Sequence, residues 1–465
     1  MSKHDEPVLL NRALSYIDQW LETQKLHDHE TPGYSVAMAY HGEIVFRKAY
    51  GLANVANKEK MAPGHLFRVA SHSKTFTATA LMQLVEAGKL SLCDPVCKYL
   101  PFLREAKDTR LQKITIQQMM AHSSGLARDG NDPSFWLMQR DFPTKEEMIS
   151  YLVHDQPVII DSNTRFKYSN YAYGLLGWVI EDVSGLSYTD YMQKHIFEPL
   201  GLEDIGADYH PEAGRYVTGY TGVAPDGRQR PLSAHSATNA MAGATGFFAT
   251  AESLCRFYTA IMPGSGKLLD DDLKKEMLRQ QWSVPDDPQQ RGYTLGFTCQ
   301  NHGKRTLYGH HGDACGNVSQ SLFDSENQIA ISVLANSHAA GPNTLHKGLW
   351  HILDFFKNHA DKEPQSYEIY AGQVYTFWES LIFVPAEDKI YVSNPSSTEP
   401  FTNCSELTHI KDNVFRISKE RGFASFGEEV EFIMDGNKVQ EVRYGKFPMY
   451  RKDVYIEKLK QISSE

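Results

Sequence analysis

The order of strand-like and helix-like segments along the chain constrains its fold most. Two strand-like runs, residues 33–40 and 44–50, lie near the N-terminus, and His41-Gly42 between them is typical of a tight hairpin turn. A helix-rich stretch, residues 71–280, comes next. Further strand-like runs follow it at residues 293–299, 305–308, 318–323 and 329–334. The simplest structure that buries all of these strands is one antiparallel sheet, built from both ends of the region and packed against a helical lobe.

Helical patterns also lie outside this block. Residues 8–26 place Leu10, Leu14, Ile17 and Leu21 at helical spacing, which predicts an N-terminal amphipathic helix. A second helix is expected over residues 343–358, after the last strand of the block. The pattern therefore predicts an α/β (α+β) fold in which an antiparallel sheet is flanked by helices.

The character of the chain changes at a polar segment. Residues 359–366 are polar, charged and contain Pro364, so they are the predicted linker. Short strand-like runs separated by turns such as Asp435-Gly436-Asn437 come after it. They are residues 373–377, 381–384, 389–392, 414–417, 430–433 and 439–442. We expect two domains, residues 1–358 and 367–465, the second a small antiparallel β-barrel or sandwich.

Composition and charge exclude several classes of protein. The 465 residues include 47 Lys and Arg against 57 Asp and Glu, a net charge of −10, which argues against nucleic acid or an anionic membrane as the main partner. No apolar run is long enough for a transmembrane helix, and the charged start of the chain does not resemble a signal peptide, so a cytoplasmic location is expected. Six cysteines are too few for a disulfide scaffold, and the spacing of Cys93 and Cys97 does not fit a zinc site.

The first candidate for chemistry is Ser71-His72-Ser73-Lys74, at the start of a helical pattern that ends at Gly88. A Ser and a Lys three residues apart lie one turn apart on the same helix face, so the amine can reach the hydroxyl and take its proton. Amides of the first helical turn favour an oxyanion nearby. The alternative is a Ser that caps a helix, followed by a surface Lys.

The second candidate is Tyr168-Ser169-Asn170, which precedes another helical pattern. On a non-helical segment, residues two apart project to one side. The phenol of Tyr168 can then move a proton, and the amide of Asn170 can hold a substrate carbonyl. The alternative is a helix-capping turn with Asn170 as the cap.

The third candidate is His310-His311-Gly312, between two strand-like runs. A Gly on an edge strand permits close approach of a substrate backbone. A His that points into the same cleft can hydrogen-bond the phenol or a substrate carboxylate. The alternative is a pair of histidines that flank a bulge.

Together, the order Ser-x-x-Lys, Tyr-x-Asn, His-x-Gly resembles the serine β-lactamase and penicillin-binding protein superfamily. The similar branch contains class C β-lactamases, DD-peptidases, D-aminopeptidases and family VIII esterases. Residues 119–126 (MMAHSSGL) are similar to the family's LLTHTSGL segment, and residues 243–252 (GATGFFATAE) are similar to its GGLFSTAED segment. The resemblance covers about residues 10–357. It implies a β-lactamase/transpeptidase-like sheet with a helical lobe, and a lipocalin-like appendage in residues 367–465.

The resemblance also implies roles for the motif residues. Ser71 is the acylated nucleophile, Lys74 its base, and Tyr168 a second acid or base that protonates the leaving group. Asn170 binds the substrate amide, and His310 occupies the position of a family Lys or His that shapes the field over Tyr168. No metal or organic cofactor is needed.

The oxyanion hole implied by the resemblance consists of the backbone N–H groups of Ser71 and of Asp313, which follows Gly312. His122 in the MMAHSSGL segment is expected to be structural, since a His beside a Ser-Ser-Gly turn can satisfy backbone carbonyls.

The third motif departs from the family pattern. It carries His310 where efficient β-lactamases have Lys, and His311 where Thr, Ser or Gly is usual. Asp313 and Cys315 replace small residues and Pro. An acidic group beside the oxyanion hole repels a substrate carboxylate, which disfavours β-lactams and favours a substrate with a cationic end.

The main hypothesis is a serine hydrolase that acts through an acyl-enzyme on small peptides, D-amino-acid amides or esters. One alternative is a β-lactamase. Another is a non-catalytic penicillin-binding or scaffold protein. In each case the expected partners are small molecules or short peptides, and a homo-oligomer held by the C-terminal domain is a further expectation.

Overall fold

The computed structural model describes residues 6–232, 236–359, 367–420 and 425–462. Its contacts divide the chain into two compact units: residues 30–343, and residues 1–29 together with 344–465. The predicted linker at 359–366 lies, except for His359, outside the described residues. The predicted domain boundaries stay a prediction, and the contacts group the first helix with the C-terminal part of the chain.

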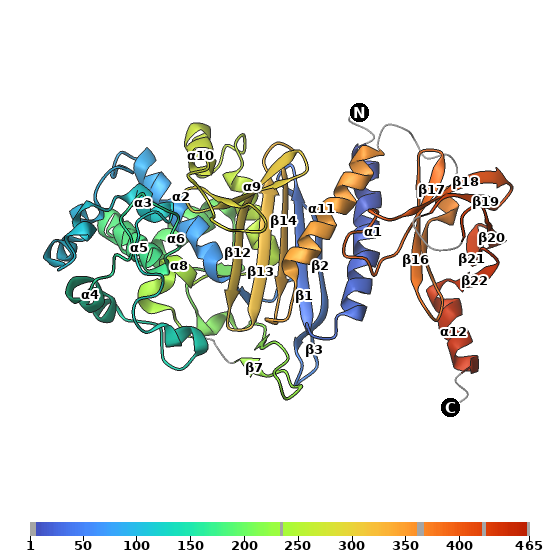
Figure 1. Ribbon diagram of the computed structural model, residues 1–465, viewed down its shortest axis with the longest axis horizontal. Helices are drawn as coiled ribbons and strands as arrows, with labels where there is room; N and C mark the ends of the chain where they lie inside the picture. Colours follow the sequence, from blue (N-terminus) through green and yellow to red (C-terminus); the bar gives the residue numbers. More distant parts are fainter. Residues whose placement is uncertain (1–5, 233–235, 360–366, 421–424, 463–465) are drawn as a thin grey trace. The chain divides into compact units, whose positions relative to one another are not determined.

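A nine-stranded sheet forms the centre of the larger unit, in the order β3-β2-β1-β14-β13-β12-β11-β10-β9. β1 (Gly33–Tyr40) pairs antiparallel with both β2 (Glu43–Asn54) and β14 (Ile329–Ala335), so the first and last strands of this unit meet in the middle of the sheet (Figure 1). The remaining strands are β3 (Glu59–Lys60), β9 (Trp282–Ser283), β10 (Gly292–Tyr293), β11 (Thr298–His302), β12 (Arg305–Ala314) and β13 (Asn317–Asp324). The prediction of one antiparallel sheet built from both ends is confirmed.

Two turns decide where strands begin and end. His41 and Gly42 both have positive φ, 46° and 87°, as a type I′ hairpin turn requires, which confirms the predicted hairpin. The single strand expected over residues 293–299 is wrong. Gly296 has φ of 97°, and the Thr294 N–H donates to the Phe297 carbonyl at 2.8 Å, so a turn splits this run into β10 and β11.

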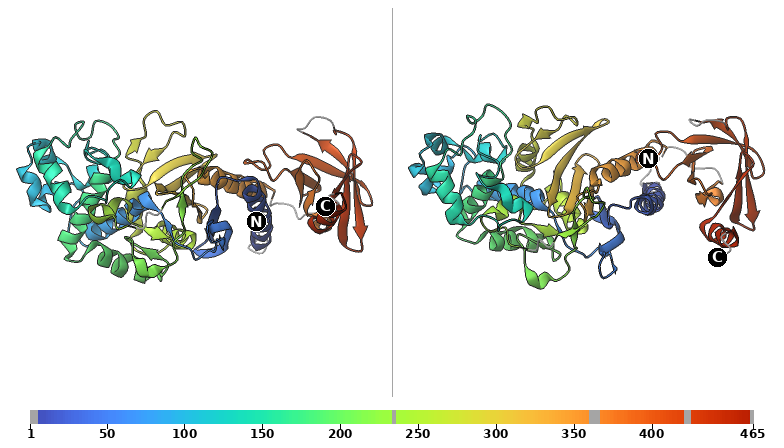
Figure 2. Two further views of the ribbon diagram at one scale, coloured as in Figure 1. Left: turned by 90° about the horizontal axis from the view of Figure 1, so that it is seen from below. Right: turned by 60° about the horizontal axis from the view of Figure 1, so that its bottom comes forward.

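The helical lobe is arranged around α2 (Ser73–Glu86), which packs against α5 (Asn170–Ser184) and α8 (Ala242–Thr245). α9 (Ala251–Ile261) covers the sheet over β1 and β14. Figure 2 shows the helices of this lobe, coloured from light blue to green, gathered beside the yellow strands. The other helices are α3 (Ile116–Met120), α4 (Lys145–His154), α6 (Tyr188–Met192), α7 (Glu198–Leu200) and α10 (Asp271–Leu278). Short strands lie among them: β4 (Phe67–Arg68), β5 (Ile205–Gly206), β6 (Gly219–Tyr220), β7 (Pro231–Leu232) and β8 (Phe248–Ala249).

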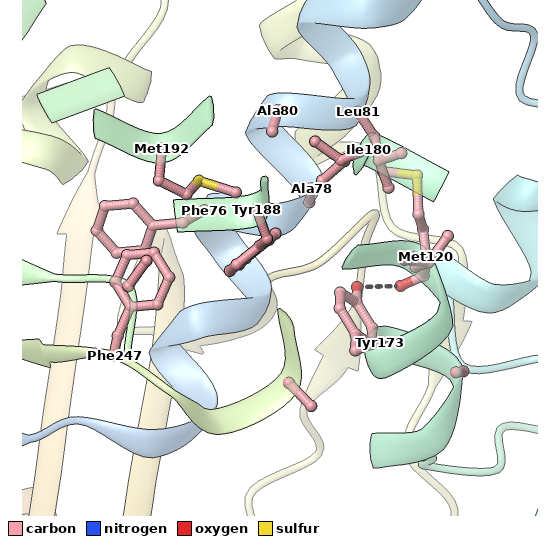
Figure 3. Packing of buried hydrophobic residues seen from close by; sticks show 14 of the residues in the cluster. Phe76, Ala78, Ala80, Leu81, Met120, Tyr173, Ile180, Tyr188, Met192 and Phe247 are labelled. Carbon is pink, nitrogen blue, oxygen red and sulfur yellow. Dashed lines mark hydrogen bonds between the residues drawn. The ribbon is translucent and has the colours of Figure 1, made fainter. Parts of the chain in front are cut away.

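α2 is buried on all sides rather than along one stripe. Its residues 73–82 are all buried, polar ones included. Phe76 stacks on Phe247 with ring centres 4.4 Å apart, and Ala78, Ala80 and Leu81 face the neighbouring helices (Figure 3). A helix surrounded by protein places any polar side chain at its start in a site with little water.

The smaller unit contains a closed barrel of eight antiparallel strands, which confirms the predicted barrel. The strands of the barrel are β15 (Gly372–Tyr375), β16 (Ser380–Ala386), β17 (Lys389–Ser393), β18 (Ser405–Lys411), β19 (Val414–Lys419), β20 (Glu429–Asp435), β21 (Lys438–Tyr444) and β22 (Phe447–Tyr450). The helices of this unit are α1 (Glu6–His27), α11 (Pro342–Asn358, in this unit from Thr344) and α12 (Lys452–Ile462). The sequence did not predict β18, β22 and α12. β18 has only two buried residues, so its pattern lacks the alternation of a half-buried strand.

Candidate active site

The Ser-x-x-Lys pair forms a direct contact. Ser71 lies in a 3₁₀ turn, Ala70–His72, which continues into α2. The Lys74 amine donates a hydrogen bond to Ser71 Oγ at 3.0 Å and another to the Ala244 carbonyl at 2.8 Å. Because Lys74 has no exposed surface, the alternative of a surface Lys is wrong.

Burial sets the protonation of Lys74. Loss of solvent lowers its pKa well below the usual value for Lys, while the nearby Asp129 carboxylate acts in the opposite direction. The amine also lies 4.9 Å from the ring centre of Tyr168 and 5.6 Å from that of Tyr173. An amine with a lowered pKa is neutral in a larger fraction of molecules near neutral pH, and a neutral amine can accept the proton of a Ser hydroxyl.

Tyr168 completes a three-residue contact. Its hydroxyl lies 2.8 Å from Ser71 Oγ. Burial raises the pKa of Tyr168, although the hydrogen bond with Ser71 opposes this, so the phenol is protonated at neutral pH. Tyr168 stands just before α5, and the cap of this helix is Ser169, whose side chain accepts from the Ala172 N–H. The alternative of a capping turn is right about the turn but wrong about the residue, since Asn170 is already the first helical residue.

Asn170 binds the carboxylate of Asp129, a residue that the sequence did not indicate as part of the site. Its Nδ2 donates to Asp129 Oδ1 at 2.7 Å. Its Oδ1 is buried and has no hydrogen-bond partner within the described residues. Asp129 also pairs with Arg128 Nε at 3.1 Å, and its side chain is 9 % exposed. The charge of this nearly buried carboxylate acts to raise the pKa of both Lys74 and Tyr168, so Asp129 belongs to the electrostatics of the site. No spacing in the sequence indicated it.

His310 is buried in the middle of β12. Its Nε2 lies 3.2 Å from the hydroxyl of Tyr293, so this hydrogen bond involves Tyr293 rather than Tyr168. Burial lowers the pKa of His310 well below its usual value. The imidazole is therefore neutral at pH 7 and does not supply the positive charge of a Lys at this position.

The end of β12 lies against the segment that precedes Ser71. A Cβ atom on Gly312 would collide with the Val69 carbonyl oxygen, so only Gly permits this approach. The next residue, Asp313, is exposed, and its carboxylate pairs with His338 Nδ1 at 2.8 Å. The close approach of Gly312 brings the two expected oxyanion-hole residues, Ser71 and Asp313, to neighbouring segments. The oxyanion hole itself stays a prediction.

This arrangement combines the groups needed for nucleophilic catalysis. A Ser hydroxyl contacts both an amine of lowered pKa and a protonated phenol, so one group can remove its proton while the other can donate one. Among the residues that the structure describes, no group of three or more His, Cys, Asp or Glu side chains is placed to hold a metal ion. No helix in the described part of the chain has the length and apolar character needed to cross a membrane.

Comparison with known proteins identifies the family. The model of the Beta-lactamase family matches residues 19–350, and the chain belongs to this family. The fold agrees with this assignment. The octameric penicillin-binding protein homologue from Pyrococcus abyssi superimposes with a TM-score of 0.64 at 23 % identity, over 95 % of this chain and 100 % of that one.

Two curated relatives are more similar in sequence, each over a shorter part of this chain. Protein flp from Staphylococcus aureus (strain MW2) is 30 % identical over 197 residues, which are 42 % of this chain and 38 % of that protein. Esterase EstB from Burkholderia gladioli is 27 % identical over 310 residues, which are 59 % of this chain and 76 % of the esterase. The match to protein flp thus spans well under half of that protein's length.

Proposed function

We propose that this protein is a serine hydrolase that cleaves small amides, peptides or esters through an acyl-enzyme on Ser71. The observation that carries the proposal is the pair of contacts on Ser71 Oγ, from Lys74 Nζ at 3.0 Å and from the Tyr168 hydroxyl at 2.8 Å. Membership of the Beta-lactamase family and the similarity to an esterase support it.

The proposed reaction begins when neutral Lys74 takes the proton of Ser71 and Oγ attacks the substrate carbonyl carbon. The oxyanion that forms accepts hydrogen bonds from the backbone N–H groups of Ser71 and Asp313. Protonated Tyr168 then gives its proton to the leaving nitrogen or oxygen as the bond to the carbonyl carbon breaks, and Lys74 returns a proton to Tyr168. Water attacks the acyl-enzyme by the same steps in reverse order and releases Ser71.

The charged groups at the end of β12 indicate which substrates this site would favour. Asp313 places a carboxylate one residue beyond Gly312, and His310 is neutral. While His338 is neutral, a substrate carboxylate would meet a negative group there and an amine would be attracted. Protonation of His338, whose pKa is raised by its hydrogen bond with Asp313, weakens this preference. We therefore propose D-amino-acid amides, short peptides with a free amine, and small esters as substrates, ahead of β-lactams.

A hydrolysis panel tests this proposal. Purified protein and its Ser71→Ala variant are assayed with p-nitrophenyl butyrate, D-Ala-p-nitroanilide and nitrocefin. The proposal expects turnover of the ester or the amide that is lost in Ser71→Ala. Nitrocefin turnover faster than both would favour the β-lactamase alternative. No turnover of any compound would favour a binding or scaffold protein.

We also propose that copies of this chain associate through the C-terminal barrel. Apolar side chains lie exposed on the barrel: Trp378 is 76 % exposed and Phe447 54 %, and their rings contact each other with centres 5.2 Å apart. The penicillin-binding protein homologue from Pyrococcus abyssi is octameric. Light scattering on the full chain tests this, since an assembly that Trp378→Lys dissociates supports the barrel as the interface. A monomeric wild-type chain would contradict it.

A further inference from the structure

His122 contacts the backbone on both sides of Tyr168. Its carbonyl oxygen accepts the N–H of Lys167 at 2.7 Å, and its Nδ1 accepts the N–H of Ser169 at 3.2 Å. Its ring lies against the ring of Tyr168, with centres 4.1 Å apart. One residue thus fixes the segment before Tyr168, the segment after it and the phenol ring between them.

These contacts require a neutral imidazole. A ring nitrogen that accepts a hydrogen bond carries no proton, so the single proton of neutral His122 is on Nε2. His122 has no exposed surface, and burial lowers its pKa. The positive charges of Lys167 and Arg128, and that of Lys74 whenever its amine is protonated, lower this pKa further. Nδ1 therefore stays an acceptor across the neutral range.

The backbone of His122 has an unusual conformation for a residue other than glycine. Its φ is 54°, in the left-handed region that non-glycine residues seldom occupy. Such conformations persist where surrounding contacts hold them, and they are frequent at functional sites. The preceding turn is fixed from the other side, because the Tyr173 hydroxyl donates to the Met120 carbonyl at 2.6 Å (Figure 3). The segment that carries His122 is therefore anchored on α5, the helix that follows Tyr168.

We propose that His122 is a positioning residue that holds the Tyr168 hydroxyl at Ser71 Oγ. The inference rests on the proposed function, in which Tyr168 moves the proton of the leaving group. His122 itself touches neither Ser71 nor, in this account, the substrate. Its contribution follows from geometry, because the hydroxyl contact of 2.8 Å is lost if the segment around Tyr168 shifts or rotates.

Two variants separate the acceptor atom from the ring. His122→Phe keeps an aromatic ring against Tyr168 but removes the acceptor for the Ser169 N–H. His122→Asn keeps a side-chain acceptor, and Asn tolerates positive φ better than most residues. Leu152→Ala serves as a control for stability loss, since Leu152 is a buried residue of α4 in the same lobe. Active sites in every preparation are counted by complete labelling with a fluorophosphonate.

The readouts are kcat per labelled site and KM for the best substrate of the panel. We expect His122→Phe to lower kcat by about tenfold or more with KM changed by less than about threefold, because a misplaced acid slows chemistry rather than binding. His122→Asn should stay within about threefold of wild type, and Leu152→Ala should keep its kcat per site. If His122→Phe does not fold, His122→Ala replaces it under the same criterion.

Two results would overturn the inference: a kcat for His122→Phe equal to that of Leu152→Ala, or an equal loss in His122→Asn and His122→Phe. Tyr168→Phe distinguishes this failure from failure of the proposed function. If Tyr168→Phe is impaired and His122→Phe is not, only the positioning role is wrong. If Tyr168→Phe keeps wild-type kcat, the role of Tyr168 in the proposed function is wrong, and the inference about His122 fails with it.

Discussion

The hydroxyl groups of Ser71 and Tyr168 lie 2.8 Å apart although 97 positions separate them in the sequence. Ser71 comes from the turn before α2 and Tyr168 from the segment before α5, two helices that pack together in the helical lobe. Their packing places a nucleophile and a proton donor within one hydrogen bond.

Lys74 should determine the acid side of the pH profile. As a base it works only when neutral, so kcat/KM should rise with pH as Lys74 loses its proton. Because burial lowers its pKa, that rise should be complete well below pH 10.5, the usual pKa of Lys. Lys74→Arg keeps a positive charge that cannot be removed and should abolish turnover. A pH profile of kcat/KM for both proteins checks this, and an active Lys74→Arg variant would show that another group is the base.

Gly312 should be intolerant of any side chain. A methyl group there collides with the Val69 carbonyl, which must shift β12 away from the segment before Ser71. We expect Gly312→Ala to lower kcat/KM by about 10²-fold, the scale of a displacement near 1 Å at a catalytic site. Gly222→Ala is the matched control, because a Cβ there meets no atom within 4 Å. Equal activity of the two variants would contradict the close approach.

Asp129 should matter for stability more than its partner Arg128. Asp129→Ala leaves the buried Asn170 amide without its acceptor, a cost of about 1–3 kcal/mol. Arg128 is 67 % exposed on its side chain, so Arg128→Ala should cost no more than about 1 kcal/mol. Urea denaturation of both variants measures the two losses. A larger loss in Arg128→Ala would mean that the ion pair, rather than the amide contact, stabilises this region.

Asp313 should select substrates with a free amine. Asp313→Asn removes the carboxylate beyond Gly312, so the ratio of kcat/KM for D-Ala-p-nitroanilide over its N-acetyl derivative should fall by about threefold or more. Asp286→Asn removes an almost fully exposed carboxylate and should leave the ratio unchanged. If the ratio is the same in wild type and Asp313→Asn, the substrate amine does not face Asp313.

The sequence predicted the sheet and the pairing of Ser71 with Lys74 for physical reasons. Short strand-like runs identified the strands at both ends of the larger unit, and these strands are buried along nearly their whole length. The spacing of Ser71 and Lys74 determines their contact within one helical turn. Tyr168 was a candidate from its own motif, but its role beside Ser71 followed only from the order of the motifs, since no local pattern shows that its segment meets Ser71.

Other features depend on contacts that no local pattern encodes. Asp129 joins the site through its hydrogen bond to Asn170, 41 residues away in the sequence. His338 joins it through its ion pair with Asp313. His122 was expected to be structural, and its acceptor role toward Ser169 emerges only once two separate segments lie side by side. The broken strand at Gly296 was missed because Leu295 and Phe297 continue the apolar character of the run on both sides while the backbone turns.

The most direct test of the central claim is the intact mass of the protein after incubation with a fluorophosphonate. We expect one adduct on the wild-type chain and none on Ser71→Ala. The same adduct on both proteins would place the nucleophile elsewhere. An unmodified wild-type chain would mean that Lys74 and Tyr168 do not activate Ser71.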